Sequence, residues 1–286
     1  MLKDRWNELC KLVETDDGLP TRKVGRWTVD KLWFWSRYLD ITTRAMVGNP
    51  SWKGGLAYVD LFAGPGVCTI EGTGRRIPGS VLIAANAPKP FDVILASELQ
   101  RNLADALRAR LASTPAAQTS HVLVGDCNDI VHQIARKIPD RALTLAFIDP
   151  EGLHANFETI RAIASRGRVD LLILFADRMD IVRNVDLYER QPRSKLDEFL
   201  GAASKWREKW PQLLNRTGDA VARFFANEYK TQLQQELRYQ KFGEKEMRSA
   251  NGPIYRLIYA SKHERGLEFW DKVTGRDRGG QTEMSF

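Results

Sequence analysis

The feature that most constrains the fold is a series of five short apolar runs separated by helix-like segments. The runs are LAYVDLF (56–62), DVILAS (92–97), HVLVGD (121–126), LTLAFID (143–149) and VDLLILFA (169–176). They are apolar throughout rather than alternating, which is typical of parallel strands covered by helices on both faces. Helices are predicted between and after them, over 80–86, 99–111, 128–137 and 156–165. The alternation predicts an α/β fold with a doubly wound, mostly parallel Rossmann-like sheet.

Length and composition favour one such core with appended pieces. The chain has 286 residues, of which 43% are hydrophobic, and it contains no apolar run long enough to span a bilayer. Its amphipathic N-terminal segment carries acidic residues and no apolar signal sequence. The three cysteines, Cys10, Cys68 and Cys127, are far apart and show no metal-ligand spacing. We therefore expect reduced thiols, no metal site and a cytoplasmic location.

The rest of the chain divides into recognisable segments. Helix candidates at 2–14 and 29–47 form an N-terminal extension over 1–50, followed by the core over 51–185. Two long charged helices within 194–241 predict a helical insertion over 186–250. Strand-like runs at 253–261 and 267–273, separated by KHERG, predict a C-terminal antiparallel hairpin over 251–275 that completes the sheet. A disordered tail is expected over 276–286.

The first apolar run ends in a turn, DLFAGPG, that brings backbone close to a ligand. A dinucleotide fingerprint needs a third glycine where this chain has Thr69, and a P-loop needs a lysine that is absent here. The form D-x-F-A-G-x-G fits S-adenosylmethionine (SAM) better, because the carboxylate of Asp60 can reach the ammonium group of SAM directly or through water. The predicted cofactor-binding residues of this turn are Asp60, Phe62, Ala63, Gly64 and Gly66. A purely structural turn is the alternative.

Three further strand ends carry acids at the edge where open α/β sheets bind ligands. Glu98, followed by Leu99, is placed to accept both ribose hydroxyls of a nucleoside, which suits NAD as well as SAM. Asp126 can accept the adenine amino group, with Cys127 beside the ring. The fourth run ends at Asp149. Each acid alone could be a helix N-cap, but four in sheet order favour a SAM site.

Several stretches together resemble the three-Cys-motif partner protein family. They are WTVDKLWFWSRYL (27–39), YVDLFAGPG, the Gly-Ser at 79–80, FIDPEG (147–152) and PIYRLIYASKHERGLEFW (253–270). The resemblance runs from Trp27 to Val273 and is loose over the insertion. It implies a class I SAM-methyltransferase-like fold and a companion protein with three clustered cysteines, itself similar to radical-SAM enzymes. It does not supply a substrate, and Glu151 stands where the family more often carries an aromatic residue.

Asp149 and Pro150 resemble the first half of the [DN]-P-P-[YF] motif of amino-methyltransferases. In that motif the acid and the proline carbonyl accept the two N–H bonds of an exocyclic amine, which aims the nitrogen lone pair at the methyl group. Here Glu151 and Gly152 replace the second half, and Glu151 is either a general base or a first-turn helix acid. Neither Cys68 nor Cys127 has a Pro-Cys context, which disfavours methylation at a pyrimidine C5.

Charge indicates a polyanionic substrate. The chain has 43 Lys and Arg against 36 Asp and Glu, a net charge of +7. Arg75 and Arg76 lie in a glycine-rich segment, 69–80, that is either a lid with a phosphate clamp or a solvated loop. Arg178 and Arg183 follow the fifth run, where they contact substrate or form salt bridges within the rim. We expect nucleic acid as the substrate and no membrane association.

These observations predict a SAM-dependent methyltransferase that acts on an amino group of a nucleic-acid base and works with the cysteine-motif companion. The alternatives are a SAM-binding subunit without catalytic activity in a complex with that companion, a small-molecule methyltransferase, and an NAD-dependent oxidoreductase, which Thr69 disfavours.

Overall fold

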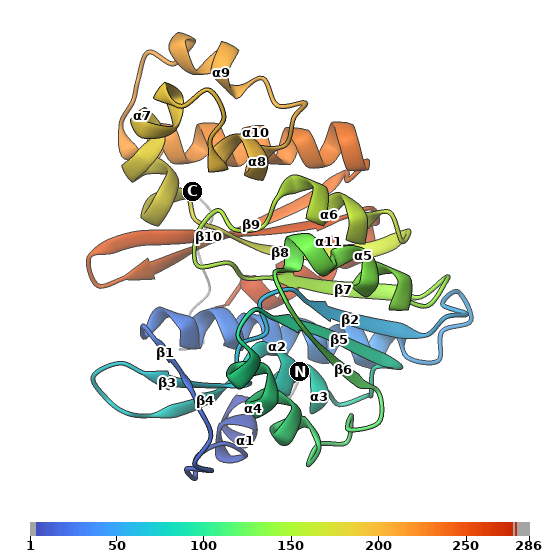
Figure 1. Cartoon of the computed structure of the whole chain (residues 1–286). Helices are drawn as coiled ribbons and strands as arrows, with labels where there is room; N and C mark the ends of the chain where they lie inside the picture. The colour runs from blue at the N-terminus through green and yellow to red at the C-terminus, as the bar shows by residue number, and fades with distance from the viewer. Residues whose placement is uncertain (1–3, 277, 279–286) are drawn as a thin grey trace.

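The computed structural model describes residues 4–276 and 278 and is built around a seven-stranded sheet (Figure 1). The strand order is β6-β5-β2-β7-β8-β10-β9. The strands are β2 (Leu56–Asp60), β5 (Val93–Glu98), β6 (Ser120–Val124), β7 (Leu143–Ile148), β8 (Arg168–Phe175), β9 (Lys241–Ser249) and β10 (Gly252–Ser261). The first five are parallel, and β10 is antiparallel to both β8 and β9. This order confirms the predicted doubly wound Rossmann-like fold of the class I methyltransferase type, with its antiparallel hairpin.

Helices cover both faces of the sheet, and each face has its own hydrophobic core. Successive residues of a strand serve opposite faces, so Tyr58 belongs to one core and Val59 to the other. The helices of the first core are α1 (Trp6–Lys11), α2 (Trp27–Met46), α3 (Ser80–Ala85), α4 (Arg101–Leu111) and α11 (Glu264–Thr274). Those of the second include α5 (Cys127–Lys137) and α6 (Phe157–Ala164).

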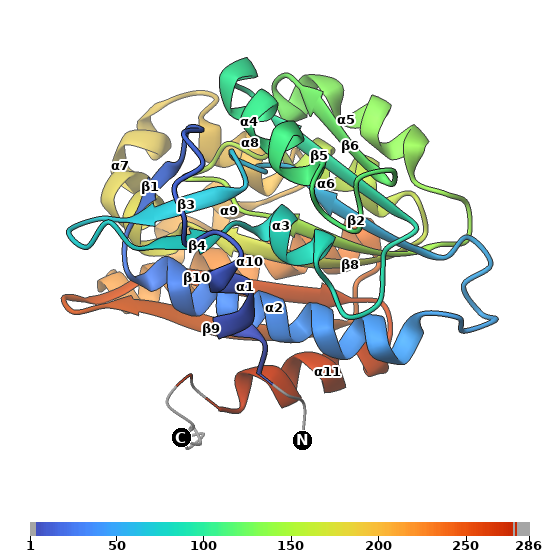
Figure 2. The same ribbon diagram turned by 90° about the horizontal axis from the view of Figure 1, so that it is seen from below.

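The long helix α2 is buried on almost all sides because it lies between the sheet and α11 (Figure 2). Trp33, Trp35 and Tyr38 are all buried in the core, where Trp35 stacks on Phe147. The cluster of aromatic residues in this part of the sequence is therefore mainly packing. Trp27, at the first turn of α2, is only half-buried.

Residues 69–80 form part of a second, small sheet rather than an open loop. This sheet has the order β1-β3-β4, with β1 (Arg22–Val24), β3 (Val67–Ile70) and β4 (Arg76–Pro78). Strands β3 and β4 pair antiparallel, and β1 pairs parallel with β3. Backbone pairing therefore holds most of the segment that was a candidate lid.

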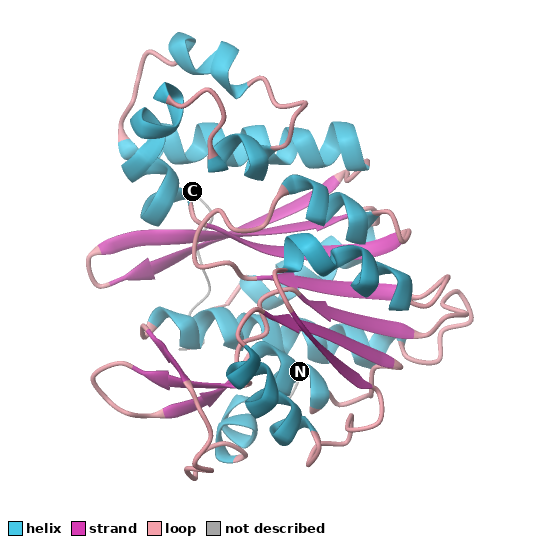
Figure 3. Cartoon of the chain, in the orientation of Figure 1, coloured by secondary structure: helices cyan, strands magenta, loops and turns pink. Residues whose placement is uncertain are grey.

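The insertion is helical but contains shorter helices than the sequence predicts (Figure 3). The expected long helix beginning at residue 194 stops at Leu200, because Gly201 has a φ of +90°. A Cβ at Gly201 would lie 2.8 Å from the ring of Phe157, so close packing requires glycine there. The elements are the π-helix Asp177–Ile181, α7 (Val182–Arg190), α8 (Lys195–Leu200), α9 (Trp206–Lys209), the 3₁₀ turn Trp210–Gln212 and α10 (Gly218–Leu237).

Two C-terminal predictions were wrong. Residues 241–249, placed in the insertion, form β9, which pairs with β10. Residues 267–273, predicted as a strand, belong to α11, whose buried residues Gly266, Phe269, Trp270, Val273 and Thr274 have helical spacing. The sequence KHERG therefore leads into a helix, with His263 as its N-cap, and the hairpin is formed by β9 and β10.

The structure describes the predicted N-terminal helix but only a small part of the predicted C-terminal tail. The first predicted helix, 2–14, is the shorter α1, and residues 1–3 lie outside the described part. The predicted disordered tail also lies outside the described residues, except for 276 and 278. Within the described part of the chain, no helix is both long and apolar enough to cross a membrane.

Candidate active site

Two adjoining cavities lie at the carboxyl ends of β2, β5 and β7, the edge where doubly wound sheets bind ligands. One has a volume of about 350 Å³ and the other of about 440 Å³. Four residues line both cavities, namely Arg22, Phe62, Asp149 and Glu151. We call the two cavities together the crevice.

The glycine turn forms one wall of the crevice, as predicted. Phe62, Ala63, Gly64 and Gly66 all line the smaller cavity. Gly64 and Gly66 have positive φ values of 61° and 85°, which favour glycine. A Cβ at Gly66 would lie 2.9 Å from a methyl group of Leu107, so this turn also packs closely on α4.

Asp60 supports the turn from below and does not line either cavity. It is completely buried, and its carboxylate accepts hydrogen bonds from the Tyr58 hydroxyl at 3.0 Å and the Phe62 amide at 3.1 Å. Burial raises the pKa of Asp60 to about 6. In this conformation the carboxylate contacts only the protein, so direct contact with a ligand is not prepared, and contact through water stays a prediction.

Glu98 ends β5 beside the glycine turn. One of its carboxylate oxygens accepts the Gly64 amide at 3.0 Å, and the other accepts the Gln100 amide at 2.9 Å. Glu98 is buried, yet it lines the larger cavity. These two backbone bonds fix the carboxylate at the position where the sequence placed a ribose acceptor.

Leu99, Asp126 and Cys127 line the same cavity as Glu98. Asp126 is also the N-cap of α5, because its side chain accepts the Asn128 amide at 2.9 Å. The capping and ligand-binding interpretations of Asp126 therefore coexist. Burial raises the pKa of Cys127 to about 12, so the thiol is not a nucleophile near neutral pH.

Asp149 lies directly after β7, is half-buried, and forms an ion pair with the buried Lys31 of α2. Its Oδ2 atom accepts the bond from Lys31 Nζ, whereas Oδ1 has no hydrogen-bond partner among the described residues. The ammonium group of Lys31 also lies 4.8 Å from the ring centroid of Trp27. Asp149 is thus anchored through one oxygen and has an unused acceptor in the other.

Pro150 and Glu151 both line the smaller cavity, but they differ in exposure. Pro150 is buried, whereas the Glu151 side chain is 75% exposed and accepts a hydrogen bond from Arg22 at 2.6 Å. The same guanidinium lies 3.8 Å from Glu98. Arg22 therefore bridges the two acids across the boundary between the cavities.

Lys31 and Arg22 are crevice residues that the sequence analysis did not place in the site. Lys31 lies within the stretch WTVDKL, four residues after Trp27. That spacing puts the two side chains on the same side of a helix, which could have indicated that both belong to the site. Arg22 had no comparable signal, because it reaches the crevice through pairing of β1 with β3.

The four predicted substrate arginines are not brought together. Arg76 pairs with Asp16 and Asp17, and Arg75 lies beside Cys10 and lines a different cavity. Arg76 is therefore held by acids of the protein, and the phosphate-clamp interpretation of this pair stays a prediction. Arg178 pairs with Asp219 at the start of α10. Arg183 is exposed and lies near Tyr255, which lines the crevice. Burial raises the pKa of the Tyr255 hydroxyl, and the positive charge of Arg183 offsets part of that rise.

No family model matches the sequence, and no curated protein matches it either. Among solved structures, cofactor-bound Rv0187 from MTB is 14% identical over 92% of each chain, with a TM-score of 0.47. An O-methyltransferase from Bacillus cereus, in complex with S-adenosylhomocysteine (SAH), is 12% identical over 92% of this chain and 93% of its own, with a TM-score of 0.47. The METTL16 MTase domain is 11% identical over 90% of this chain and 79% of its own, with a TM-score of 0.43. Likenesses at these identities and TM-scores assign neither a family nor a substrate, and the resemblance to the three-Cys-motif partner family stays a prediction.

Proposed function

We propose that this protein is a SAM-dependent methyltransferase. One observation carries the proposal: a single crevice holds a fixed carboxylate suited to ribose and a second carboxylate with an unused oxygen. Glu98 is the first, and Asp149, which lines both cavities, is the second. The crevice therefore combines a nucleoside subsite with an acceptor subsite.

The residues present fit SAM. Glu98 would accept the ribose hydroxyls, and Leu99, Asp126 and Cys127 would surround the adenine. The close backbone of Gly64 would hold the methionine end, with Arg22 near enough to meet its carboxylate, since a Cβ on Gly64 would lie 3.7 Å from the Arg22 guanidinium. Asp60 would act from below by fixing the turn through the Phe62 amide.

The proposed acceptor is an amino group on a nucleic-acid base. When SAM is bound, it supplies an electrophilic methyl group on a sulfonium. Asp149 Oδ1 can accept one amino hydrogen and the Pro150 carbonyl the other, which turns the nitrogen lone pair toward that methyl. Transfer would exchange the C–S bond of SAM for a new N–C bond, and Asp149 would accept the proton that the methylated nitrogen releases.

Two features of the crevice support a planar, nucleic-acid acceptor. Trp27 and Tyr255 line the smaller cavity with their ring centroids 4.6 Å apart, which offers a stacking surface next to Asp149. Arg183 lies nearby and can meet a phosphate. The resemblance adds the proposal that a companion protein with three clustered cysteines presents or modifies the same substrate.

A hydroxyl acceptor is the second candidate, and the Lys31–Asp149 pair favours it. A hydroxyl must lose its proton as its oxygen attacks, so it needs a base beside it more than an amine does. Asp149 Oδ1 would take that proton, and Lys31 holds the carboxylate in place through Oδ2. This candidate would make the protein an O-methyltransferase for a small aromatic alcohol or a ribose.

The test is transfer of tritium from labelled SAM to total RNA, DNA, protein and a small catechol, with and without the candidate companion. Chromatography of the hydrolysed product distinguishes an N-methylated base from an O-methyl product. Asp149→Asn should abolish transfer while SAH binding, measured by calorimetry, stays within about threefold of wild type, because Asp149 is not a cofactor ligand in this proposal.

Asp140→Asn is the matched control, because Asp140 is an exposed aspartate that pairs with Arg166 away from the crevice. It should leave both transfer and binding unchanged. Methyl transfer that persists in Asp149→Asn would remove the catalytic role of this residue. SAH binding without transfer to any acceptor, companion included, would favour the non-catalytic subunit, and absence of SAH binding would overturn the proposal.

A further inference from the structure

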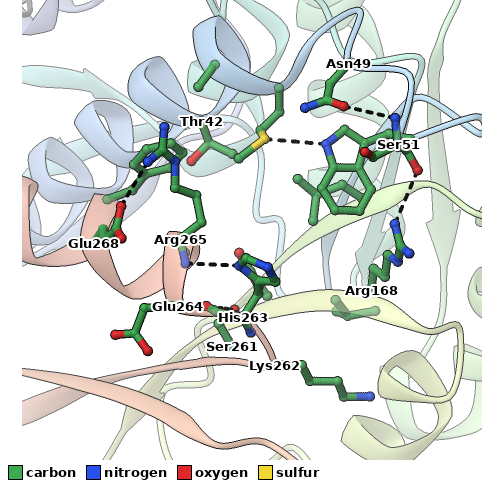
Figure 4. A pocket seen from close by; sticks show the side chains of 18 of the residues that line it. Thr42, Asn49, Ser51, Arg168, Ser261, Lys262, His263, Glu264, Arg265 and Glu268 are labelled. Carbon is green, nitrogen blue, oxygen red and sulfur yellow. Dashed lines mark hydrogen bonds and ion pairs between the residues drawn. The ribbon is translucent and has the colours of Figure 1, made fainter.

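The crevice and a larger cavity hold their cations in different ways. The larger cavity has a volume of about 770 Å³, lies at the opposite edge of the sheet and includes Asp170 in its lining. We call it the amino-edge cavity, because β7 and β8 begin there. Arg168 donates to the Ser51 carbonyl at 3.2 Å in this cavity (Figure 4), and Lys262 also contacts backbone carbonyls. In the crevice, by contrast, the guanidinium group of Arg22 lies between two side-chain carboxylates, which can turn away from it as backbone carbonyls cannot.

Arg22 lies at the boundary between the two parts of the crevice and lines both of them. Its Nη1 atom donates to Glu151 at 2.6 Å, and its Nη2 atom lies 3.8 Å from a carboxylate oxygen of Glu98. A Cβ on Gly64 would lie 3.7 Å from the Nε atom of Arg22. The guanidinium group therefore covers the glycine turn, at the place where a ligand that fills both cavities would lie.

The two carboxylates beside Arg22 are held with different strength. Glu98 is buried, and the backbone amides of Gly64 and Gln100 donate to its two oxygens. The Glu151 side chain is 75% exposed, and among the residues that the structure describes only Arg22 donates a hydrogen bond to it. Water competes with an exposed ion pair, so such a pair contributes little to stability. Arg22 can therefore leave Glu151 with a small loss of free energy, whereas Glu98 stays in place.

The backbone that carries Arg22 is tied to the glycine turn. Arg110 of α4 donates to the carbonyls of Pro20 at 2.8 Å and Pro65 at 2.6 Å, and it forms an ion pair with Asp17 at 2.7 Å. Pro65 lies within the glycine turn, and Pro20 lies two residues before Arg22. Strand β1 also pairs with β3. A change of partner by Arg22 therefore needs a rotation of its side chain only, and the guanidinium group stays close to the turn.

We propose that Arg22 changes partner when SAM binds, leaving Glu151 and binding the carboxylate of the methionine moiety. This change of partner depends on the proposed function, in which the glycine turn holds that end of SAM. A guanidinium group binds a carboxylate through two parallel N–H donors. The methionine carboxylate would lie inside the crevice, where less water screens it than screens Glu151, so Arg22 gains a stronger partner.

The change of partner also alters the acceptor side of the crevice. Glu151 lines both cavities, as Asp149 does. Once Arg22 has left it, the Glu151 carboxylate can accept a hydrogen bond from an N–H or O–H group of the methyl acceptor. Arg22 thus selects the amino-acid end of the cofactor, and Glu151 becomes a specificity-determining residue for the acceptor only after the cofactor is bound.

The experiment is a calorimetric titration of the full chain with SAH and, separately, with the analogue of SAH that lacks only its carboxylate. Arg22→Gln should weaken SAH binding roughly tenfold, because a charge-assisted hydrogen bond is lost. The analogue should bind Arg22→Gln within about threefold of its affinity for wild type, since it offers Arg22 no carboxylate. A purely structural role of Arg22 would weaken both ligands equally.

Glu151→Gln, alone and combined with Arg22→Gln, tests the change of partner itself. In the single variant Arg22 has no charged partner to leave, so SAH should bind about twofold more tightly than to wild type. In the double variant, SAH affinity should equal that of Arg22→Gln. A crystal structure of the SAH complex should show the Arg22 guanidinium on the ligand carboxylate and Glu151 without its bond to Arg22.

Arg26→Gln is the matched control, because Arg26 is exposed, belongs to the same segment and lines neither part of the crevice. It should bind both ligands as wild type does, and thermal unfolding of every variant checks that folding is unchanged. Equal losses for the two ligands in Arg22→Gln, or an SAH complex in which Arg22 keeps Glu151, would overturn this inference and leave the proposed function standing. Wild-type protein that binds neither ligand would overturn both.

Discussion

The two edges of the central sheet carry their charges differently. At the carboxyl edge, two cations of the crevice are paired with its acids, Lys31 with Asp149 and Arg22 with Glu151, whereas Lys23 and Lys195, which also line it, form no ion pair with a described carboxylate. At the amino edge, Arg168 and Lys262 contact carbonyls and rings, and neither forms an ion pair with a carboxylate of the part of the chain that the structure describes. The first edge holds charges of both signs close together, and the second holds cations that lie on opposite faces of the sheet and contact backbone carbonyls.

The difference follows from how each edge is built. Helices of a doubly wound sheet begin near the carboxyl edge, where acids such as Asp126 cap them and meet their positive ends. At the amino edge α6 ends, and Lys262 contacts the carbonyl of Ala164 in its last turn. The carbonyl groups at the end of a helix favour a cation such as Lys262 without any carboxylate. The ammonium group then keeps hydrogen-bond donors that are not used by an acid.

The largest effect on stability is expected from breaking the Lys31–Asp149 ion pair at the carboxyl edge. Lys31→Met should lower the free energy of unfolding by about 3 kcal/mol, because it leaves the half-buried Asp149 carboxylate without its charged partner. The double variant Lys31→Met with Asp149→Asn should recover much of this loss, since the charge itself is then gone. Urea denaturation measures both.

Arg161 and Glu236 form the matched pair for this comparison, with 3.1 Å between them and about one third of each side chain exposed. Arg161→Gln should cost less than about 1 kcal/mol. If Lys31→Met unfolds at the same urea concentration as wild type, the pair does not form in solution, and the contrast between the edges loses its main support.

The next effect concerns the acid beneath each cavity, Asp60 at one edge and Asp170 at the other. The folded pKa of Asp60 is about 6, above its unfolded value of 3.8, because burial disfavours the charged form. Its contribution to stability is therefore fully present below pH 3.8 and is lost as the pH rises through about 6. Asp60→Asn should gain about 2–3 kcal/mol relative to wild type between about pH 4 and about pH 7.

Asp170→Asn should change in the same direction, since burial also raises the pKa of Asp170. Denaturant unfolding across this pH range measures both variants. Asp40 and Asp177 also have pKa values raised to about 6 by burial, so the comparison is made as the difference from wild type, in which their contributions cancel. An Asp60→Asn curve parallel to wild type would show that Asp60 is not titrating in this range.

The sequence predicted the carboxyl edge better than the amino edge for a physical reason. Apolar runs mark buried strands, and a polar residue at the end of a run must lie at the edge of the sheet, so Glu98, Asp126 and Asp149 were found. Lys31 and Arg22 come from N-terminal elements, and their approach depends on how α2 and β1 pack, which no local pattern records.

The wrong predictions arose where a short stretch of sequence fits two structures, such as a strand and a helix, or a free and a paired arginine. The run LEFWDKV has several apolar residues in a short stretch, and only its burial at helical spacing identifies α11. Arg75 and Arg76 looked like a free clamp because glycines surround them, but Asp16 and Asp17, nearly sixty residues earlier, neutralise Arg76. The amino-edge cavity could not be predicted, because it gathers residues from α2, β8 and β10 whose proximity exists only in the folded sheet.

A smaller effect tests the nucleoside subsite of the carboxyl edge. Glu98→Gln should weaken SAH binding about tenfold to a hundredfold, because two ribose hydroxyls lose a charged acceptor. Glu151→Gln is the matched change in the same crevice, and its side chain is 75% exposed. It should alter SAH affinity by less than about threefold. If calorimetry finds the same loss of SAH affinity in both variants, Glu98 has no special role in binding SAH.

The smallest effect is the response of SAH binding to salt. SAH carries one ammonium and one carboxylate, and Lys31 and Arg22 of the crevice are already paired with acids, so few counterions are released when it binds. Its affinity should change by less than about twofold between about 50 and about 200 mM NaCl.

Calorimetry for SAH at the two salt concentrations measures this response. Arg22→Gln sharpens it, because removing the guanidinium leaves Glu98 and Glu151 without their shared cation. The crevice then carries excess negative charge, and the ammonium of SAH should make its binding weaken modestly as salt rises. A steep salt dependence of SAH binding in wild type would mean that the charges of the crevice are not paired before the ligand arrives. The two edges would then differ only in the sign of their charge, because neither would have its charged side chains paired before a ligand binds.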